Sequence, residues 1–86
     1  MKFDWSKKGR EARAAEHANL KEGERVMTWL EWWGEGVVQS NDPARKYRNP
    51  ATNRMKGAKP LHVVREDGTV GFFHYDQVQR IAKEAN

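Results

Sequence analysis

The chain has 86 residues, a formal net charge of +4 and no cysteine, with 37% hydrophobic and 33% charged residues. This composition fits one small domain, and the lack of cysteine excludes disulfides, thiolate zinc sites and cysteine nucleophiles. No apolar run approaches the roughly 20 residues that cross a bilayer and no secretory signal opens the chain, so we expect a cytoplasmic protein without membrane contact.

The charge is spread unevenly along the chain. Residues 41–60 carry six basic side chains against one acid, and residues 1–21 carry six against three. The remainder holds four basic residues against eight acids, so the segments with strand character are acidic. Positive charge that packing does not require favours an anionic partner, either nucleic acid or an acidic protein surface.

The first predicted element is a helix from Asp4 to about Lys21, capped by Asp4 or Ser6 and favoured by several alanines. Residues three or four apart share one helical face, which would be basic here. That face contains Arg10, Arg13, His17 and Lys21. We therefore treat residues 1–21 as an N-terminal basic helix or arm.

Strand character follows in residues 25–30 and 36–40, returns in 61–65 and 70–75, and ends in a short strand around 79–81 after a helical turn. A plain C-terminal helix over residues 76–86 is the alternative. Asp67-Gly68 predicts a two-residue turn, which would place His62 opposite Phe73 and His74 opposite Leu61. The two imidazoles would then lie on opposite faces, which argues against a shared metal.

The apolar residues of these segments supply the predicted core, which is large enough for one small barrel. Its members are Val26, Leu30, Val37, Val38, Leu61, Val63, Val64, Val70, Phe72, Phe73, Val78 and Ile81.

The order of these motifs resembles an SH3-like small β-barrel of the KOW or Tudor type. The resemblance rests on Gly23-Glu24-Arg25-Val26, Gly36-Val37-Val38, Val63-Val64 with the Asp67-Gly68 turn, and residues 78–81, and it covers residues 22–82. It implies a mainly β domain over residues 22–86 with the long basic loop 41–60 inserted. Fold likeness alone does not assign a function.

The chain also resembles the plasmid-borne type II dihydrofolate reductases, which are barrels of similar size. That family carries a valine-glutamine-isoleucine-tyrosine run where this chain has Val70-Gly71-Phe72-Phe73, so the ligand-binding amide is missing. Compact chains of this kind further resemble small bacteriophage accessory proteins that redirect host machinery.

The basic loop is the main candidate site. Lysine and arginine neutralise phosphates, and Tyr47 could stack on an unpaired base. The alternative is a solvated loop whose charge only aids solubility. The candidate contacts are Arg45, Lys46, Tyr47, Arg48, Arg54, Lys56 and Lys59, with Arg10, Arg13 and Lys21 from the helix.

Three tryptophans fall within five residues, at Trp29, Trp32 and Trp33. Strand alternation puts Trp29 and Trp33 on the face opposite Val26, where the N-terminal helix could cover them. A protein-binding patch or a base-stacking platform is the alternative.

These patterns predict a non-catalytic nucleic-acid-binding module, with DNA and RNA both open as the ligand. The alternative is a protein-binding module, such as a phage-encoded inhibitor, that docks on an acidic surface through its tryptophans and basic loop. No catalytic set, cofactor motif or metal-ligand spacing is evident. The oligomeric state is left open.

Overall fold

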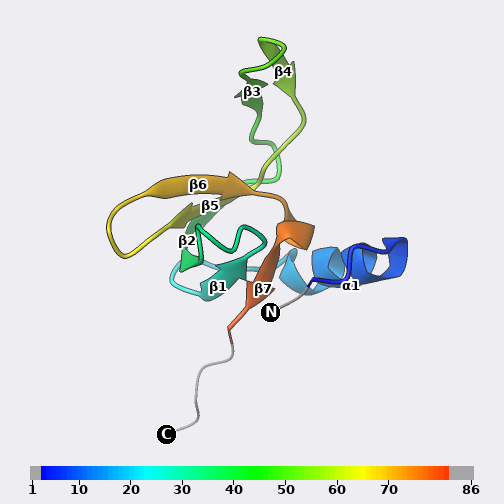
Figure 1. Cartoon of the computed structure of the whole chain (residues 1–86), viewed down its shortest axis with the longest axis vertical. Coiled ribbons are helices and arrows are strands. Elements are labelled where there is room, and N and C mark those ends of the chain that lie inside the picture. The colour runs from blue at the N-terminus through cyan, green and yellow to red at the C-terminus, as the bar shows by residue number, and fades with distance from the viewer. Residues whose placement is uncertain (1–2, 82–86) are drawn as a thin grey trace, which may run out of the picture.

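The structure is a computed structural model that describes residues 3–81. A helix, α1 (Lys7–His17), lies beside an antiparallel five-stranded sheet, and a two-stranded hairpin projects away from both (Figure 1). In spatial order the sheet consists of β6 (Val70–Phe73), β5 (Leu61–Val64), β2 (Glu35–Asn41), β1 (Arg25–Thr28) and β7 (Val78–Arg80). The prediction of a small, mainly β domain with an N-terminal helix is confirmed.

The helix begins at Lys7 because Ser6 caps it. The Ser6 hydroxyl accepts a hydrogen bond from the Gly9 N–H at 3.2 Å, which satisfies one of the free donors of the first turn. The helix ends at His17, four residues before the predicted end at Lys21.

The C-terminal end of α1 is held by Asn41, the last residue of β2. The Asn41 side-chain amide donates to the carbonyls of Ala18 and Leu20 at 3.1 and 3.0 Å. The Tyr75 hydroxyl donates to the Asn41 side-chain oxygen at 2.7 Å. Asn41 therefore ties together the helix end, β2 and the 3₁₀ turn η1 (Tyr75–Gln77) that precedes β7.

The core lies on the inner face of the sheet. Cross-strand neighbours Val38 and Val63 are both buried, as are Val26 and Val78 at the β1–β7 side. Six of the twelve predicted core residues are buried, and Leu20 and Trp33 join them. The buried apolar cluster is Leu20, Val26, Trp33, Val38, Leu61, Val63, Phe73 and Val78.

The prediction was wrong for three core candidates, because Val37, Val70 and Phe72 are exposed. Successive residues of a strand point to opposite faces, so the inward position of Val38 forces Val37 outward, and Phe73 does the same to Phe72. Three further candidates, Leu30, Val64 and Ile81, are half-buried.

Trp33 fills space that two glycines leave open. Its ring lies against the inner positions of Gly36 in β2 and Gly71 in β6, and it meets Phe73 edge-on with ring centroids 5.2 Å apart. A Cβ on Gly71 would lie 3.1 Å from the Trp33 indole. Gly71, which stands where the type II reductases have a glutamine, thus makes room for Trp33 in the core.

The β5–β6 turn has three residues, Glu66, Asp67 and Gly68, rather than the predicted two. The Arg65 N–H donates to the Thr69 carbonyl at 2.8 Å across the turn, and Gly68 adopts a φ of +91°.

The extra turn residue shifts the register of the hairpin by one position, so His62 faces Phe72 and Leu61 faces Phe73. The predicted pairing of His62 with Phe73, and of His74 with Leu61, was therefore wrong.

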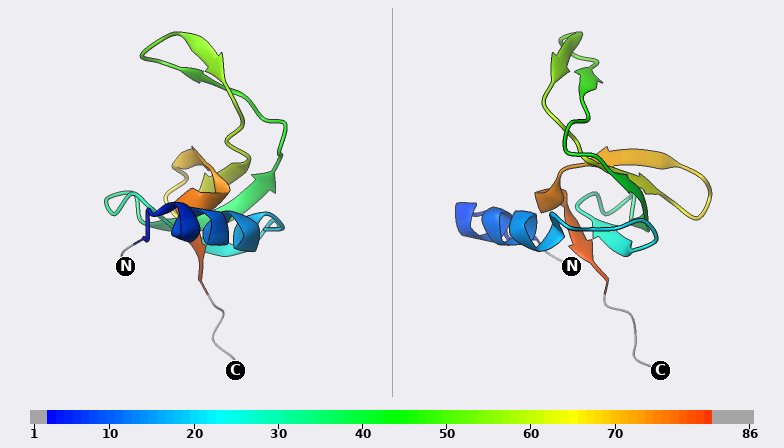
Figure 2. Two further views of the ribbon diagram at one scale, coloured as in Figure 1. Left: turned by 90° about the vertical axis from the view of Figure 1, so that its right-hand side faces the viewer. Right: turned by 180° about the vertical axis from the view of Figure 1, so that it is seen from behind.

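Residues 41–60 are also not the structureless loop that the sequence suggested. β3 (Tyr47–Asn49) pairs with β4 (Arg54–Lys56), and these residues 47–56 form what we call the projecting hairpin (Figure 2). Its pairs are Tyr47 with Lys56, Arg48 with Met55, and Asn49 with Arg54.

At the C-terminal end, the turn η1 followed by β7 confirms the predicted last strand over the alternative helix up to residue 81. Residues 82–86, which that helix would have included, lie outside the described residues. β6 and β7 are the edges of the sheet, and no pairing within residues 3–81 joins them into a closed barrel. None of the helices in this range is long and apolar enough to cross a membrane.

The tight packing at Gly36 generates a stability prediction. An added Cβ would lie 2.7 Å from a Val63 methyl and 2.8 Å from the Val64 carbonyl oxygen, and the backbone atom cannot rotate away. Gly36→Ala should therefore lower the free energy of unfolding by about 1–3 kcal/mol in urea denaturation. Gly57→Ala is the matched control, because nothing lies within 4 Å of its added Cβ. Equal urea midpoints for both variants would contradict the packing described.

Candidate nucleic-acid interface

The projecting hairpin presents basic side chains on both of its faces. Paired residues of an antiparallel ribbon share a face, so Lys56 lies with Tyr47 and Arg54 lies with Asn49, while Arg48 lies with Met55 on the other side. Four of the predicted contacts between residues 41 and 60 are exposed, namely Lys46, Arg48, Arg54 and Lys56, and the last three of these belong to the hairpin. The hairpin is therefore positively charged whichever face a ligand approaches.

This charge is not neutralised by the protein's own acids. The Arg and Lys ion pairs in the described part of the chain all lie in the sheet and its turns: Arg25 with Glu35, Arg80 with Glu24, and Arg65 with Asp67. The basic residues between 41 and 60 make no such pair within residues 3–81. An external anion would thus find them unpaired.

Arg45 differs from the other basic residues because it braces the base of the hairpin. Its guanidinium donates to the Pro60 carbonyl at 2.9 Å and to the Ser40 hydroxyl at 2.6 Å. It also lies 5.0 Å from the centroid of the Phe72 ring. Arg45 connects the two ends of the inserted segment, residues 41–60, to β2 and β6, so we assign it an anchoring role.

Tyr47 is only partly available for stacking. Its ring is half-buried, and the Lys59 ammonium lies 4.4 Å from the ring centroid. This cation–π contact holds Lys59 against the aromatic face that an unpaired base would use. The predicted stacking role of Tyr47 is therefore restricted to its remaining surface.

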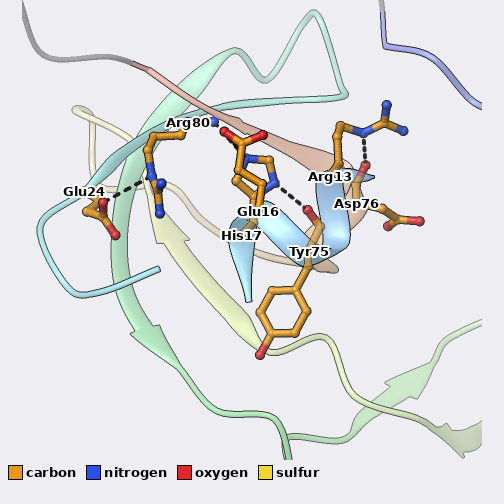
Figure 3. A network of polar contacts seen from close by, with 7 residues as sticks. All are labelled: Arg13, Glu16, His17, Glu24, Tyr75, Asp76 and Arg80. Carbon is orange, nitrogen blue, oxygen red and sulfur yellow. Dashed lines mark hydrogen bonds and ion pairs between the residues drawn. The ribbon is translucent and has the colours of Figure 1, made fainter. Parts of the chain in front are cut away.

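The basic face predicted for α1 points largely inward. Arg13 is only 7% exposed, and its guanidinium donates to the Asp76 carbonyl at 2.7 Å (Figure 3) and to the Asp4 carbonyl at 2.6 Å. It also lies 5.0 Å from the Phe3 ring centroid and 4.8 Å from that of Trp5. Arg13 therefore anchors the helix and is not placed to contact a ligand.

His17 completes this internal contact and is fully buried. Its Nδ1 lies 3.0 Å from the Tyr75 carbonyl, and its Nε2 accepts a hydrogen bond from the Arg80 N–H at 3.1 Å (Figure 3). This pattern requires the neutral tautomer with the proton on Nδ1. Burial lowers the pKa of His17, and the charge of Arg80 acts in the same direction. Of the predicted basic face, Arg10 and Lys21 remain exposed.

A groove of about 490 Å³ separates α1 from the base of the projecting hairpin. Arg10 and Ala14 line it from the helix, and Pro43, Ala58 and Pro60 line it from the inserted segment. The helix and the residues that flank the hairpin therefore border one depression, which the sequence could not establish.

His74 lies in the same groove. Burial, and then the nearby charge of Lys59, lower the pKa of His74. At neutral pH the lining of the groove thus carries the charges of Arg10 and Asp76, with the Lys59 ammonium near His74.

The three clustered tryptophans do not form one surface. Trp33 is in the core beneath the β5–β6 hairpin, and Trp29 contacts Trp5 edge-on at 5.9 Å, just before the helix. Trp32 is 75% exposed and shares a depression with acidic residues of the adjacent turn, among them Glu66. Neither Trp29 nor Trp33 lies beneath α1 as predicted, because the helix packs on η1 and β7.

A surface that the sequence did not reveal lies on the outer face of the sheet. Val37, Val64 and Val70 are cross-strand neighbours in one row, and Phe72 stacks on His62 beside them with ring centroids 4.9 Å apart. We call these five residues the outer apolar patch. The hydrophobicity of the three valines and Phe72 suggested core positions. Only the alternation of inward and outward side chains along each strand could have indicated that they form a surface.

No group of three or more histidine or acidic side chains suited to hold a metal occurs within residues 3–81. The corrected register places His62 on the outer face, whereas His74 lies beyond the end of β6 in the groove beside α1.

Comparison with protein-family models, with curated proteins and with solved structures finds no match to this chain.

The buried neutral His17 predicts a pH dependence of stability. Its folded pKa lies below the usual 6.5, so on acidification the unfolded chain binds a proton before the folded chain does. The stabilisation is fully present above about pH 6.5 and should fall by up to about 1.4 kcal/mol per pH unit below it.

Urea denaturation between pH 7.5 and 5.5 measures this effect in a His74→Gln background, which removes the second histidine with a lowered pKa. A free energy of unfolding that stays constant over this range would contradict a neutral, buried His17.

Proposed function

We propose that this protein is a non-catalytic nucleic-acid-binding module that uses the projecting hairpin as its main contact. The observation that carries the proposal is a hairpin with three exposed basic residues and a fourth, Lys46, immediately before it, none of them paired with a carboxylate within residues 3–81. Arginine and lysine on a protruding ribbon can neutralise several phosphates and release their counterions.

The groove beside α1 supports a second, smaller contact. Arg10 lies on the helix side and Lys59 belongs to the strand-to-strand connection on the other side. A polyanion that contacts the hairpin could continue into this groove, where Arg10 would meet its backbone. Arg13 and Arg45 have no part in this contact, because their hydrogen bonds hold the fold.

We also propose that the five-stranded sheet is SH3-like. With β3 and β4 set aside, the spatial strand order is fourth, third, second, first, fifth, and a 3₁₀ turn precedes the last strand. The short turn between the fourth and fifth strands is the feature expected from the motif resemblance. This likeness supports the fold assignment and does not itself indicate a ligand.

The salt dependence of binding tests the nucleic-acid proposal. With about five phosphates contacted on duplex DNA, log affinity should fall against log salt with a slope of about −4.5. Arg54→Gln with Lys56→Gln should reduce the slope by about 1.8, because each lost phosphate contact contributes about 0.9. Gel-shift titrations over a range of salt concentrations measure both values.

Lys8→Gln with Arg25→Gln is the matched control, because it removes the same charge from exposed positions on the helix and the sheet. Its slope should equal that of the unmodified protein. A salt-independent affinity, or equal slopes for the hairpin variant and the control, would remove the proposal.

A second candidate function, docking onto another protein, is favoured by the outer apolar patch. Phe72 is 40% exposed and its ring contacts both His62 and the Arg45 guanidinium, which makes it an apolar anchor beside a basic residue. The aromatic residue next to the inserted basic segment is thus Phe72, whereas the exposed Trp32 has acidic neighbours. Under this alternative Phe72 replaces the tryptophans as the expected hot spot.

Phe72→Ser tests the docking alternative. If the patch binds a protein, a partner captured from nuclease-treated lysate should bind this variant about 30-fold or more weakly, as expected for a hot spot. Trp32→Ser is the control and should retain the partner. Equal capture by both variants, with folding verified by thermal denaturation, would exclude the patch as the docking surface.

A further inference from the structure

The tip of the projecting hairpin is ordered by its own hydrogen bonds. The Asn53 N–H donates to the Asn49 carbonyl at 2.7 Å, and the Ala51 N–H donates to the Asn49 side-chain oxygen at 2.9 Å. The Arg48 guanidinium donates to the Asn53 carbonyl at 2.9 Å and to its side-chain oxygen at 3.2 Å. Asn53 adopts a φ of +57°, a left-handed conformation that asparagine tolerates better than most residues.

This order is not required by packing on the rest of the protein. Residues 50–57 are all exposed, and the hairpin stands clear of the sheet and the helix in every view (Figures 1 and 2). Fixing a tip costs conformational entropy, and here hydrogen bonds within the turn, without packing on the rest of the protein, act against that cost. A tip whose shape is set by its own hydrogen bonds is suited to enter an outside surface in a preset conformation.

The tip combines an apolar proline ring with arginine and asparagine side chains. Pro50 is the first residue of the turn 50–53 and its one ring, Asn49 and Asn53 lie at the two ends of the turn, and Arg48 and Arg54 follow on opposite faces of the ribbon. Proteins that bind the DNA minor groove use arginine and asparagine to read it, and they insert apolar residues, proline among them, between base steps. This combination at one tip points to duplex DNA.

Single strands fit the tip less well. Binding of single strands relies on exposed aromatic rings that stack on successive bases. The aromatic ring of the projecting hairpin is Tyr47, at its base, where Lys59 covers one face. Double-stranded RNA also fits less well, because its minor groove is wide and shallow and is recognised mainly by shape.

We infer that Pro50 inserts between base pairs from the minor groove of duplex DNA and kinks the duplex. This inference rests on the proposed nucleic-acid function and specifies its ligand and mode of binding. Arg48 and Arg54 would then contact the groove on either side of the inserted ring, while Lys46 and Lys56 contact phosphates further along the ribbon. Insertion should favour DNA whose stacking is already weakened, such as a duplex with a two-base mismatch.

The test measures DNA bending and affinity together, with energy transfer between dyes on the two ends of a short duplex. The unmodified protein should bring the ends closer and should bind a mismatched duplex about tenfold more tightly than a matched one. Pro50→Ala should lose both effects while its salt slope stays unchanged. Thr52→Ala is the matched control, since it trims an exposed side chain of the same turn and leaves the proline ring in place, and it should behave like the unmodified protein.

Pro50→Leu separates a wedge from a residue that only shapes the turn. Leucine can also act as an apolar wedge, so this variant should retain bending. Loss of bending in both Pro50 variants, or bending that survives in Pro50→Ala, would overturn the inference. Distamycin, which occupies the minor groove, should compete with the protein, and an absence of competition would also overturn it.

Failure of this inference can be distinguished from failure of the proposed function. Salt-dependent binding to duplex DNA without bending, or tighter binding to single strands, would reject the wedge and leave nucleic-acid binding in place. An absence of salt-dependent binding to any nucleic acid would reject both.

Discussion

The neutral imidazole of His17 is the contact on which the position of the helix depends. Its two ring nitrogens join α1 to the Tyr75 carbonyl of η1 and to the Arg80 N–H of β7. Arg13, one turn earlier, adds a hydrogen bond to the Asp76 carbonyl. Two residues that looked like part of a ligand-binding face are therefore used to build the fold, whereas Arg48, Arg54 and Lys56 of the projecting hairpin stay exposed.

Sequence patterns predicted the strands well and the two faces of the sheet poorly. The sheet strands contain the doublets Val37-Val38, Val63-Val64 and Phe72-Phe73, and in each of these one side chain faces the core and the other faces out. Hydrophobicity does not distinguish the members of a doublet, so all six appeared to be core residues. Their orientation depends on cross-strand register and on the three-residue turn at 66–68, both of which are set by tertiary structure.

The candidate site was predictable in composition and not in shape. The charge count located the basic segment 41–60, but strands of three residues with a proline and an asparagine between them carry little strand signal. For the helix, the residues that share one face were predictable, but the burial of that face was not. Spacing correctly placed Arg13 and His17 on one face, yet only the packing of η1 and β7 determines that this face is buried.

The separation of the hairpin from the sheet also separates binding from stability. The Arg and Lys ion pairs of the described chain stay within the sheet and its turns, while the hairpin carries its charge into solvent, where salt screens exposed charges beyond about 8–10 Å. Neutralising Arg54 or Lys56 therefore removes no contact that holds the core. Conversely, the core that centres on Val38, Val63 and Trp33 contributes nothing to an anion-binding surface. A small domain can in this way carry an exposed basic ribbon at little cost to its own folding, because the acids that could neutralise it lie elsewhere in the fold.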